Sequence, residues 1–301
     1  RGINGVRLEG SDFGPYTGEY VIISENKFSV FGGNSPDQGV FIGGLQSPRV
    51  QNVIIEGNSF ISTPGKVSVA ISRGAGDAFT IRNNVFKDIP GQAISNGADI
   101  VNYLKKWRIY NNTFYHTGPL LRLTGTKMPN LQIRNNIFFR NSGAKVIETG
   151  NTPIPSNSEA IAETIETSNI IWPSGGNLFT FTDNTSTQNY TLAQWQALGK
   201  GQGSSSVDPL LTNTNDQLQS VSPAINTGAV LPVIRDYFGG ARPFGSGYDI
   251  GAHEFGSGGG ATSYTLSITK SGTGIGTVTG GGLNCGNACS VNLNSGTSVT
   301  L

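Results

Sequence analysis

Four side chains in the first half of the chain could together carry out proton-transfer chemistry on an acidic polymer: Arg73, Tyr103, Lys105 and Arg122. A β-elimination needs a cation beside the substrate carboxylate, a base for the neighbouring proton and an acid for the leaving oxygen. Arginine binds carboxylates through paired hydrogen bonds, which suits Arg73 and Arg122 to the first task. Lys105 becomes a base if burial or nearby arginines lower its pKa, and Tyr103 suits either proton transfer.

Further side chains in this region suit the binding of an extended polar polymer. Rings can stack on sugars, and amide and hydroxyl groups can bond to sugar hydroxyls. The candidate substrate-binding residues are Arg7, Tyr16, Phe41, Asn96 and Thr124. Asp77 and Asp99 are candidates for holding Ca²⁺, although calcium takes more oxygen ligands than two carboxylates provide. The alternative for each charged residue is structural, because exposed charges also protect sheet edges from aggregation.

The elements that would position these residues recur along the chain. Five stretches consist of an apolar run, then an Asn, and a Phe two residues later, with spacings of 32, 26, 28 and 24 residues. A near-regular period of this length indicates a repeat architecture. The asparagines are Asn26, Asn58, Asn84, Asn112 and Asn136, and the phenylalanines are Phe28, Phe60, Phe86, Phe114 and Phe138.

A second series of apolar segments, each ending in Gly, runs out of phase with the first: residues 6–10, 40–44, 70–74, 93–97, 121–125 and 146–150. Two series in fixed order, plus a segment after each Asn, predict three short strands per turn of a right-handed parallel β-helix. Each Asn would occupy a left-handed corner and stack on the next Asn, and each Phe would stack inside.

Aligning the glycines of the second series predicts which residues face outward. The position four residues before each Gly is always apolar and should point inward, so alternation places its neighbours outside. One predicted outer column contains Arg7, Phe41, Ile71, Ile94, Arg122 and Ile147. The other contains Glu9, Gly43, Arg73, Asn96, Thr124 and Thr149.

Composition narrows the classes of function. The net charge of the 301 residues is +1 and no basic run is present, so nucleic acid is not an expected partner. Two histidines exclude a His-rich metal site, and no apolar run is long enough to span a membrane. Cys285 and Cys289 predict one local disulfide and an oxidising, extracytoplasmic setting, with a metal-binding pair as the alternative.

The chain divides into three parts. Residues 1–255 form the predicted β-helix, with a capping region at about 190–255 that starts with a short helix over 190–199, with Thr191 as its N-cap and Gly199 as its C-terminal stop. Residues 256–263 are a Gly/Ser linker. Residues 264–301 alternate like short strands of a small, incomplete β module. We expect the chain to be a piece of a longer secreted protein, because no N-terminal cap is visible.

The capping region carries a family resemblance. The order of its motifs resembles the C-terminal part of secreted bacterial β-helix proteins of the choice-of-anchor type, within the pectate-lyase-like superfamily. The resemblance covers roughly residues 20–255, and residues 264–301 resemble a partial divergent internalin B-type repeat. The motifs are a helix with Trp195, Asp208-Pro209-Leu210, Ser222-Pro223-Ala224-Ile225, Asp236 to Arg242-Pro243, and Asp249-Ile250-Gly251-Ala252-His253-Glu254.

This resemblance implies a secreted or bacterial surface protein, and a site on the outer face of the strand before the long loops. It does not imply an activity. Asp236, Arg242, Asp249 and Glu254 would then form ion pairs that cap the solenoid. Two lyase and hydrolase signatures of such proteins, Arg-His-Gly and the paired-aspartate motifs, are absent, and Ser72-Arg73-Gly74 matches the first only in part.

Three functions remain as alternatives. The first is an extracellular protein that binds acidic polysaccharide or a cell-surface glycan, including a polysaccharide lyase acting on a uronate polymer. The second is a non-catalytic surface, adhesive or fibre-forming protein that assembles through its solenoid ends or C-terminal modules. The third is a glycoside hydrolase, for which Glu9 and Asp12 are the close carboxylate pair.

Overall fold

The structure is a computed structural model, and it describes only part of the 301 residues. The described residues are 4–9, 21–31, 37–43, 51–62, 68–73, 77–96, 106–125, 130–150, 152–212, 217–258, 263–269, 272, 276–280, 283–285, 289–294 and 299–300.

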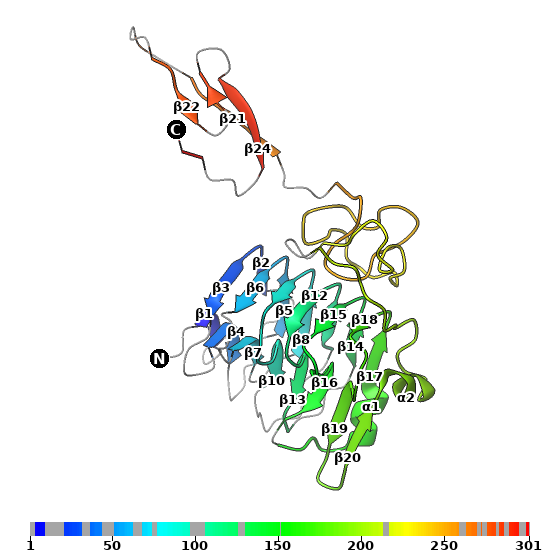
Figure 1. The fold of residues 1–301 in the computed structure, drawn as a ribbon. Helices are drawn as coiled ribbons and strands as arrows, with labels where there is room; N and C mark the ends of the chain where they lie inside the picture. Colours follow the sequence, from blue (N-terminus) through cyan, green and yellow to red (C-terminus); the bar gives the residue numbers. More distant parts are fainter. Residues whose placement is uncertain are drawn as a thin grey trace.

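Most of the described strands belong to three long sheets in which strands from successive turns of the chain pair in parallel (Figure 1). The first sheet contains β1 (Asn4–Glu9), β4 (Asp37–Gly43), β7 (Ser68–Arg73), β10 (Ile94–Asn96), β13 (Leu121–Leu123), β16 (Ile147–Thr149) and β19 (Phe179–Thr182), and ends with the antiparallel β20 (Thr187–Tyr190).

The second sheet contains β2 (Val21–Ser24), β5 (Gln51–Glu56), β8 (Asp77–Arg82), β11 (Arg108–Tyr110), β14 (Leu131–Arg134) and β17 (Thr164–Thr167). The third contains β3 (Lys27–Phe31), β6 (Ser59–Ser62), β9 (Val85–Lys87), β12 (Thr113–Thr117), β15 (Ile137–Arg140) and β18 (Ile170–Trp172). One strand from each sheet makes a coil, and β1, β2 and β3 make coil 1. This arrangement confirms the predicted parallel β-helix.

Aromatic stacking runs through the core as the repeat predicts. The rings of the five repeat phenylalanines, from Phe28 to Phe138, stack on one another in consecutive coils with centroids 4.5–5.2 Å apart. Phe60, Phe86 and Phe114 have no exposed surface. Burial of these rings and of the strand residues around them supplies the main stabilisation of the solenoid.

The asparagine ladder is also confirmed, and Asn169 extends it by one coil. The Oδ1 of each Asn after the first accepts the Nδ2 of the preceding one at 3.0–3.1 Å, and also accepts its backbone N–H. At the last rung, the Nδ2 of Asn169 donates to Glu166 at 2.6 Å. The hydroxyl of Ser204 donates to the same carboxyl, and burial raises the pKa of Glu166.

The left-handed corner lies one residue earlier than the sequence predicts. The residue before each ladder Asn has a positive φ of 49–65°, whereas the ladder residues do not. The physical reason is that a ladder Asn uses its amide for stacked hydrogen bonds, and the turn itself is made by its predecessor. These predecessors, which we call the corner column, are Glu25, Gly57, Asn83, Asn111, Asn135 and Ser168.

Two short helices follow the last coils. α1 (Asn157–Glu163) connects the first sheet to the second. α2 (Leu192–Ala197) is the predicted helix, and Thr191 caps it with a reciprocal bond to Gln194. The indole of Trp195 stacks on Phe179, with ring centroids 4.5 Å apart, and is fully buried. α2 therefore covers the end of the core.

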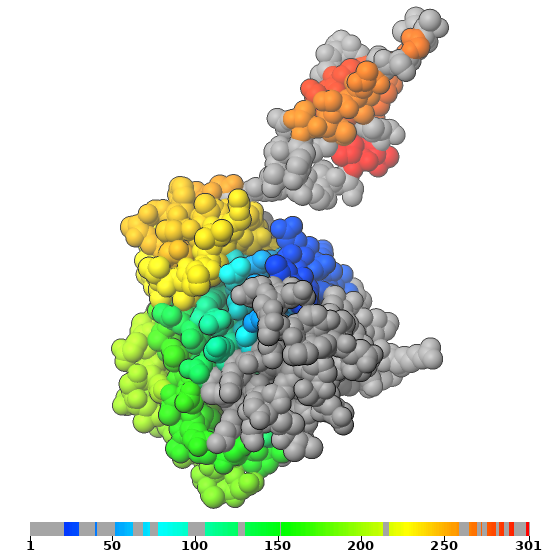
Figure 2. All heavy atoms as spheres, turned by 180° about the vertical axis from the view of Figure 1, so that it is seen from behind, coloured from blue at the N-terminus to red at the C-terminus, as the bar shows by residue number. Residues whose placement is uncertain are grey.

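Residues 217–258, which we call the flank segment, do not lie at the end of the solenoid. They run beside the corner column, and Figure 2 shows them in yellow, packed over the cyan and green coils. The side chain of Asn83 donates to the Arg235 carbonyl at 2.5 Å, that of Asn111 to the Asp249 carbonyl, and that of Asn135 to the Ala229 carbonyl. The region expected to be a cap therefore has two parts: α2 covers the end of the core, and the flank segment covers one side of the coils.

The C-terminal residues form small antiparallel sheets. β21 (Ser263–Ser267) pairs with β24 (Ser290–Asn294), and β22 (Thr279–Gly280) pairs with β23 (Leu283–Asn284). The predicted disulfide between Cys285 and Cys289 is present, with Cα atoms 4.4 Å apart. Among the described residues, no helix is long and apolar enough to cross a membrane.

Candidate functional site

The backbone register of the first sheet defines which residues share a row on its outer surface. Pairing places six residues in line, which we call the outer row: Arg7, Phe41, Ser72, Ser95, Arg122 and Glu148. The expectation that Ile71, Ile94 and Ile147 belong to this row is wrong, because all three are buried in the core. Aligning the glycines shifted the register by one residue at the third coil, where Val40 pairs with Ile71 and not with Ala70.

The second predicted column is not one row either. Arg73 pairs with Ile42 and with Asn96, whereas Glu9 pairs with Gly43. Leu123, which is buried, pairs with Thr149, so Thr124 lies one residue beyond that row. The hydroxyl of Thr149 accepts the Thr182 N–H at 2.9 Å, which is a structural bond within the sheet.

Most of the predicted catalytic, sugar-binding and metal residues cannot be placed together. Tyr16, Asp99, Tyr103 and Lys105 lie outside the described residues. The same holds for the side chains of Arg7, Phe41, Arg73, Asp77 and Asn96, whose backbones alone are described. Among the described residues, no group of three or more His, Cys, Asp or Glu is arranged to hold a metal.

Arg122 is the predicted site residue that the structure describes best. Its Nε lies 3.8 Å from a carboxylate oxygen of Glu148 on the next coil, and both side chains are partly exposed. Gly150 leaves the space beside it, since a Cβ at that position would come within 2.9 Å of the guanidinium Nε and 2.5 Å of the Thr124 hydroxyl. The outer row thus presents opposite charges on adjacent coils.

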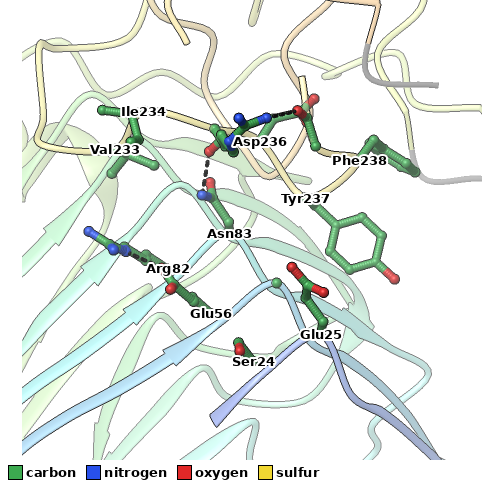
Figure 3. Close-up of a pocket in the computed structure, with 13 residues that line it drawn as sticks. Ser24, Glu25, Glu56, Arg82, Asn83, Val233, Ile234, Asp236, Tyr237 and Phe238 are labelled. Atoms are coloured by element: carbon green, nitrogen blue, oxygen red, sulfur yellow. Dashed lines mark hydrogen bonds and ion pairs between the residues drawn. The ribbon is translucent and has the colours of Figure 1, made fainter. Parts of the chain in front are cut away.

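A pocket of about 440 Å³ lies on another side of the molecule, between the corner column and the flank segment (Figure 3). Sequence reasoning missed it, because the flank segment that forms its upper wall was expected at the end of the solenoid. The residues that line it are Ser24, Glu25, Glu56, Gly57, Arg82, Asn83 and 233–239.

Polar groups in the pocket are held by short hydrogen bonds. The Nε of Arg82 donates to Glu56 at 2.7 Å, and its Nη1 donates to the Pro232 carbonyl at 3.0 Å. The guanidinium of Arg235 donates to the Gly239 carbonyl at 3.0 Å. Figure 3 shows the Arg82–Glu56 pair on one side and Tyr237 above Glu25 on the other.

A buried charge cluster holds the flank segment together next to this pocket. Arg242 donates to Glu254 at 2.8 Å, and neither side chain is exposed. Asp249 accepts the N–H groups of Asn226 and Phe255, and Asp236 accepts those of Gly240 and Glu254. Burial raises the pKa of each of the three carboxyls, which the bonds to N–H groups partly offset.

This cluster is structural, as the sequence predicts for its four residues. Its position differs from the prediction, because it stabilises a segment along the side of the solenoid and not a cap at its end. The two carbonyls that Arg242 also binds, those of Asp249 and Gly251, face the corner column, where Asn111 donates to the same Asp249 carbonyl.

Comparison with protein-family models finds no match to the chain, and comparison with curated proteins finds none either. The parallel β-helix is therefore established by the structure alone. Membership of the pectate-lyase-like superfamily and the internalin B-type repeat stay predictions, and they rest on the motifs described above.

Proposed function

We propose that the chain is an extracellular polysaccharide-binding protein and that the outer row of the first sheet binds an extended acidic glycan. The observation that carries the proposal is the register of this row, which aligns charged, hydroxyl and aromatic residues on six consecutive coils. Paired strands are about 4.8 Å apart, so the row offers binding groups at regular short intervals along a line. A linear polymer can use such a row at several points at once.

The residue types in the row suit a uronate polymer. Arg122 can form paired hydrogen bonds to a sugar carboxylate, and Ser72 and Ser95 can exchange hydrogen bonds with sugar hydroxyls. Glu148 competes with the ligand for Arg122 at one coil. Each contact should therefore be weak, and the affinity should grow with the number of sugar units that reach the row.

Binding assays with paired variants test the proposal. Isothermal titration with polygalacturonate, alginate and chondroitin should show binding that salt weakens. Arg122→Ala should weaken it about tenfold or more, because a hydrogen bond to a charged group contributes roughly 1.5–3 kcal/mol. Arg108→Ala is the matched control on β11 of the second sheet and should not alter it. Equal effects of the two variants, or no binding to any polymer, would contradict the proposal.

Cleavage is a separate question with its own assay. Ultraviolet absorbance of the unsaturated product should rise with time if the chain is a lyase, and Arg73→Ala and Lys105→Ala should both slow the rise. Binding without an absorbance change would leave the chain as a binding protein. Filaments in negative-stain images, without glycan binding, would favour the fibre-forming alternative.

A further inference from the structure

We infer that the pocket beside the flank segment is a second glycan site, which takes a neutral pyranose unit. The inference goes beyond the acidic polymer proposed for the outer row, because it concerns another surface and a ligand of different charge. It rests on how the pocket is formed, on the polar groups that face it and on the balance of its charges.

The pocket exists because the corner column changes at its first two coils. In coils 3, 4 and 5 an Asn side chain in this column bonds to the backbone of the flank segment. At the equivalent positions of coils 1 and 2 the chain has Glu25 and Gly57. Gly57 has no side chain to bridge the gap, and a Cβ there would meet only Glu25, at 3.7 Å or more.

The resulting space has the dimensions of a small-molecule site. Its volume of about 440 Å³ is within the range of roughly 300–1,000 Å³ that is usual for ligand pockets. Tyr237 and Phe238 are half-buried and lie on the flank-segment wall, with ring centroids 4.9 Å apart at 90°. Such rings offer flat apolar surface to the C–H face of a sugar, while the opposite wall is polar.

The polar wall supplies acceptors and donors suited to sugar hydroxyls. The carboxylate of Glu25 is exposed, and no described residue forms an ion pair with it. An ionised carboxylate only accepts hydrogen bonds, so it suits two neighbouring hydroxyl donors. Arg82 carries five N–H donors, of which Glu56 and the Pro232 carbonyl occupy two sites, and the others can reach ring or hydroxyl oxygens.

The charges in the pocket favour a neutral ligand over an acidic one. The charges of Arg82 and Glu56 compensate each other across 2.7 Å, and the carboxylate of Asp236 is buried against backbone N–H groups. The two other charged side chains that line the pocket, Glu25 and Arg235, are of opposite sign, so the lining has no net charge to attract an ionised sugar. The outer row differs, because its register aligns two arginines, Arg7 and Arg122, with one carboxylate, that of Glu148.

The test compares two variants of the pocket with one of the outer row. Gly57→Asn places the side chain of the later coils in the pocket, and Asn adopts the required positive φ in coils 3 to 5. Glu25→Gln removes the charge of the Glu25 carboxylate, and Glu148→Gln alters only the outer row. Circular dichroism melting would show whether each variant is folded.

Heteronuclear NMR titration with the methyl glycosides of glucose, galactose, mannose and xylose, together with digalacturonate and glucosamine, should give shifts at residues 233–239 for at least one neutral glycoside. Gly57→Asn should weaken this binding tenfold or more, and Glu25→Gln should weaken it severalfold. Glu148→Gln should leave it unchanged. The inference is overturned if no neutral glycoside shifts these residues, if digalacturonate or glucosamine binds there more tightly, or if folded Gly57→Asn binds like the parent chain. None of these results depends on whether the outer row binds polygalacturonate.

Discussion

His253 is the residue whose protonation should affect the flank segment most directly. Its Nδ1 accepts the N–H of Leu218 at 3.0 Å, and burial together with the charge of Arg242 lowers the pKa of the imidazole to about 4. The fold therefore favours the neutral ring. The preference for the neutral ring contributes to the free energy of unfolding. This contribution is complete above the ordinary pKa of 6.5 and is lost as the pH falls towards 4, at a cost of about 3 kcal/mol.

Urea unfolding at pH 7, 5.5 and 4 would measure this contribution. His253→Asn keeps a hydrogen-bond acceptor but does not titrate, so the difference in unfolding free energy between parent and variant should shrink as the pH falls. The other acids of the cluster are present in both proteins and cancel in the comparison. A difference that stays constant with pH would contradict the assignment of this hydrogen bond to a neutral ring.

At the scale of single residues, the positions that recur in every coil could be predicted from the sequence. The predictions failed where strand residues do not alternate between inward and outward positions. The ladder asparagines and stacked phenylalanines were predictable because each coil has one of each. The outer row was misassigned from coil 3 onward because neighbouring residues are both buried there: Ala70 and Ile71 in coil 3, and Ala93 and Ile94 in coil 4, where Ala93 precedes β10. Residues at a corner do not follow the alternation of a strand, so two neighbours can both face inward.

The asparagine ladder acts as an element in its own right, and its middle should matter more than its end. The side chain of Asn112 makes five hydrogen bonds: it accepts two from Asn84 and donates to Ile81, Tyr110 and Asn136. Asn112→Ala leaves several buried groups without partners, and each costs about 1–3 kcal/mol. We expect a loss of about 3 kcal/mol or more in unfolding free energy.

Asn26→Ala is the matched control, because Asn26 is the exposed first rung and, among the described residues, its side chain donates to Ser24 and Asn58 alone. Its loss should stay below about 1 kcal/mol. Urea denaturation followed by circular dichroism would give both values. Similar losses at the two positions would show that coil packing, and not the amide ladder, dominates this corner.

Among the elements, the three sheets were predictable from period alone, while α1 and the flank segment were not predicted. α1 had a signal that was overlooked: Ser156 caps it, its hydroxyl accepts the N–H of Glu159, and the Ser-x-x-Glu spacing is typical of a helix start. The flank segment has no such signal, since its backbone has almost no strand or helix pairing of its own. It is held by side chains far away in the sequence.

The pocket could not be predicted from the sequence for the same reason, since its two walls come from residues about 150–215 positions apart in the chain. A signal was nevertheless present in the corner column. Glu25 and Gly57 stand where coils 3 to 5 have Asn, and this departure from the repeat marks where the flank segment loses its attachment. Breaks in a repeat are therefore as informative about binding surfaces as the repeat is about the fold.

At the scale of the whole molecule, the flank segment is a second structural layer tied to a solenoid whose hydrogen bonds do not depend on it. The attachment uses bonds between residues 94–152 positions apart, and the Arg242–Glu254 pair fixes the segment internally. Arg242→Met leaves buried carboxylates without their cation, which typically costs 3–5 kcal/mol. We expect the flank segment to open while the coils stay folded.

Hydrogen exchange read by mass spectrometry would separate the two layers. In Arg242→Met, peptides from residues 223–255 should lose protection, whereas peptides with the ladder N–H groups of Asn84 and Asn112 should keep it, because those N–H groups bond to the next coil. The double variant Arg242→Met with Glu254→Leu is the control, since it removes both charges and should recover much of the protection. Loss of protection in the coils to the same extent as in the flank segment would mean that both layers unfold as one cooperative unit, and the pocket between them would then be as rigid as the core.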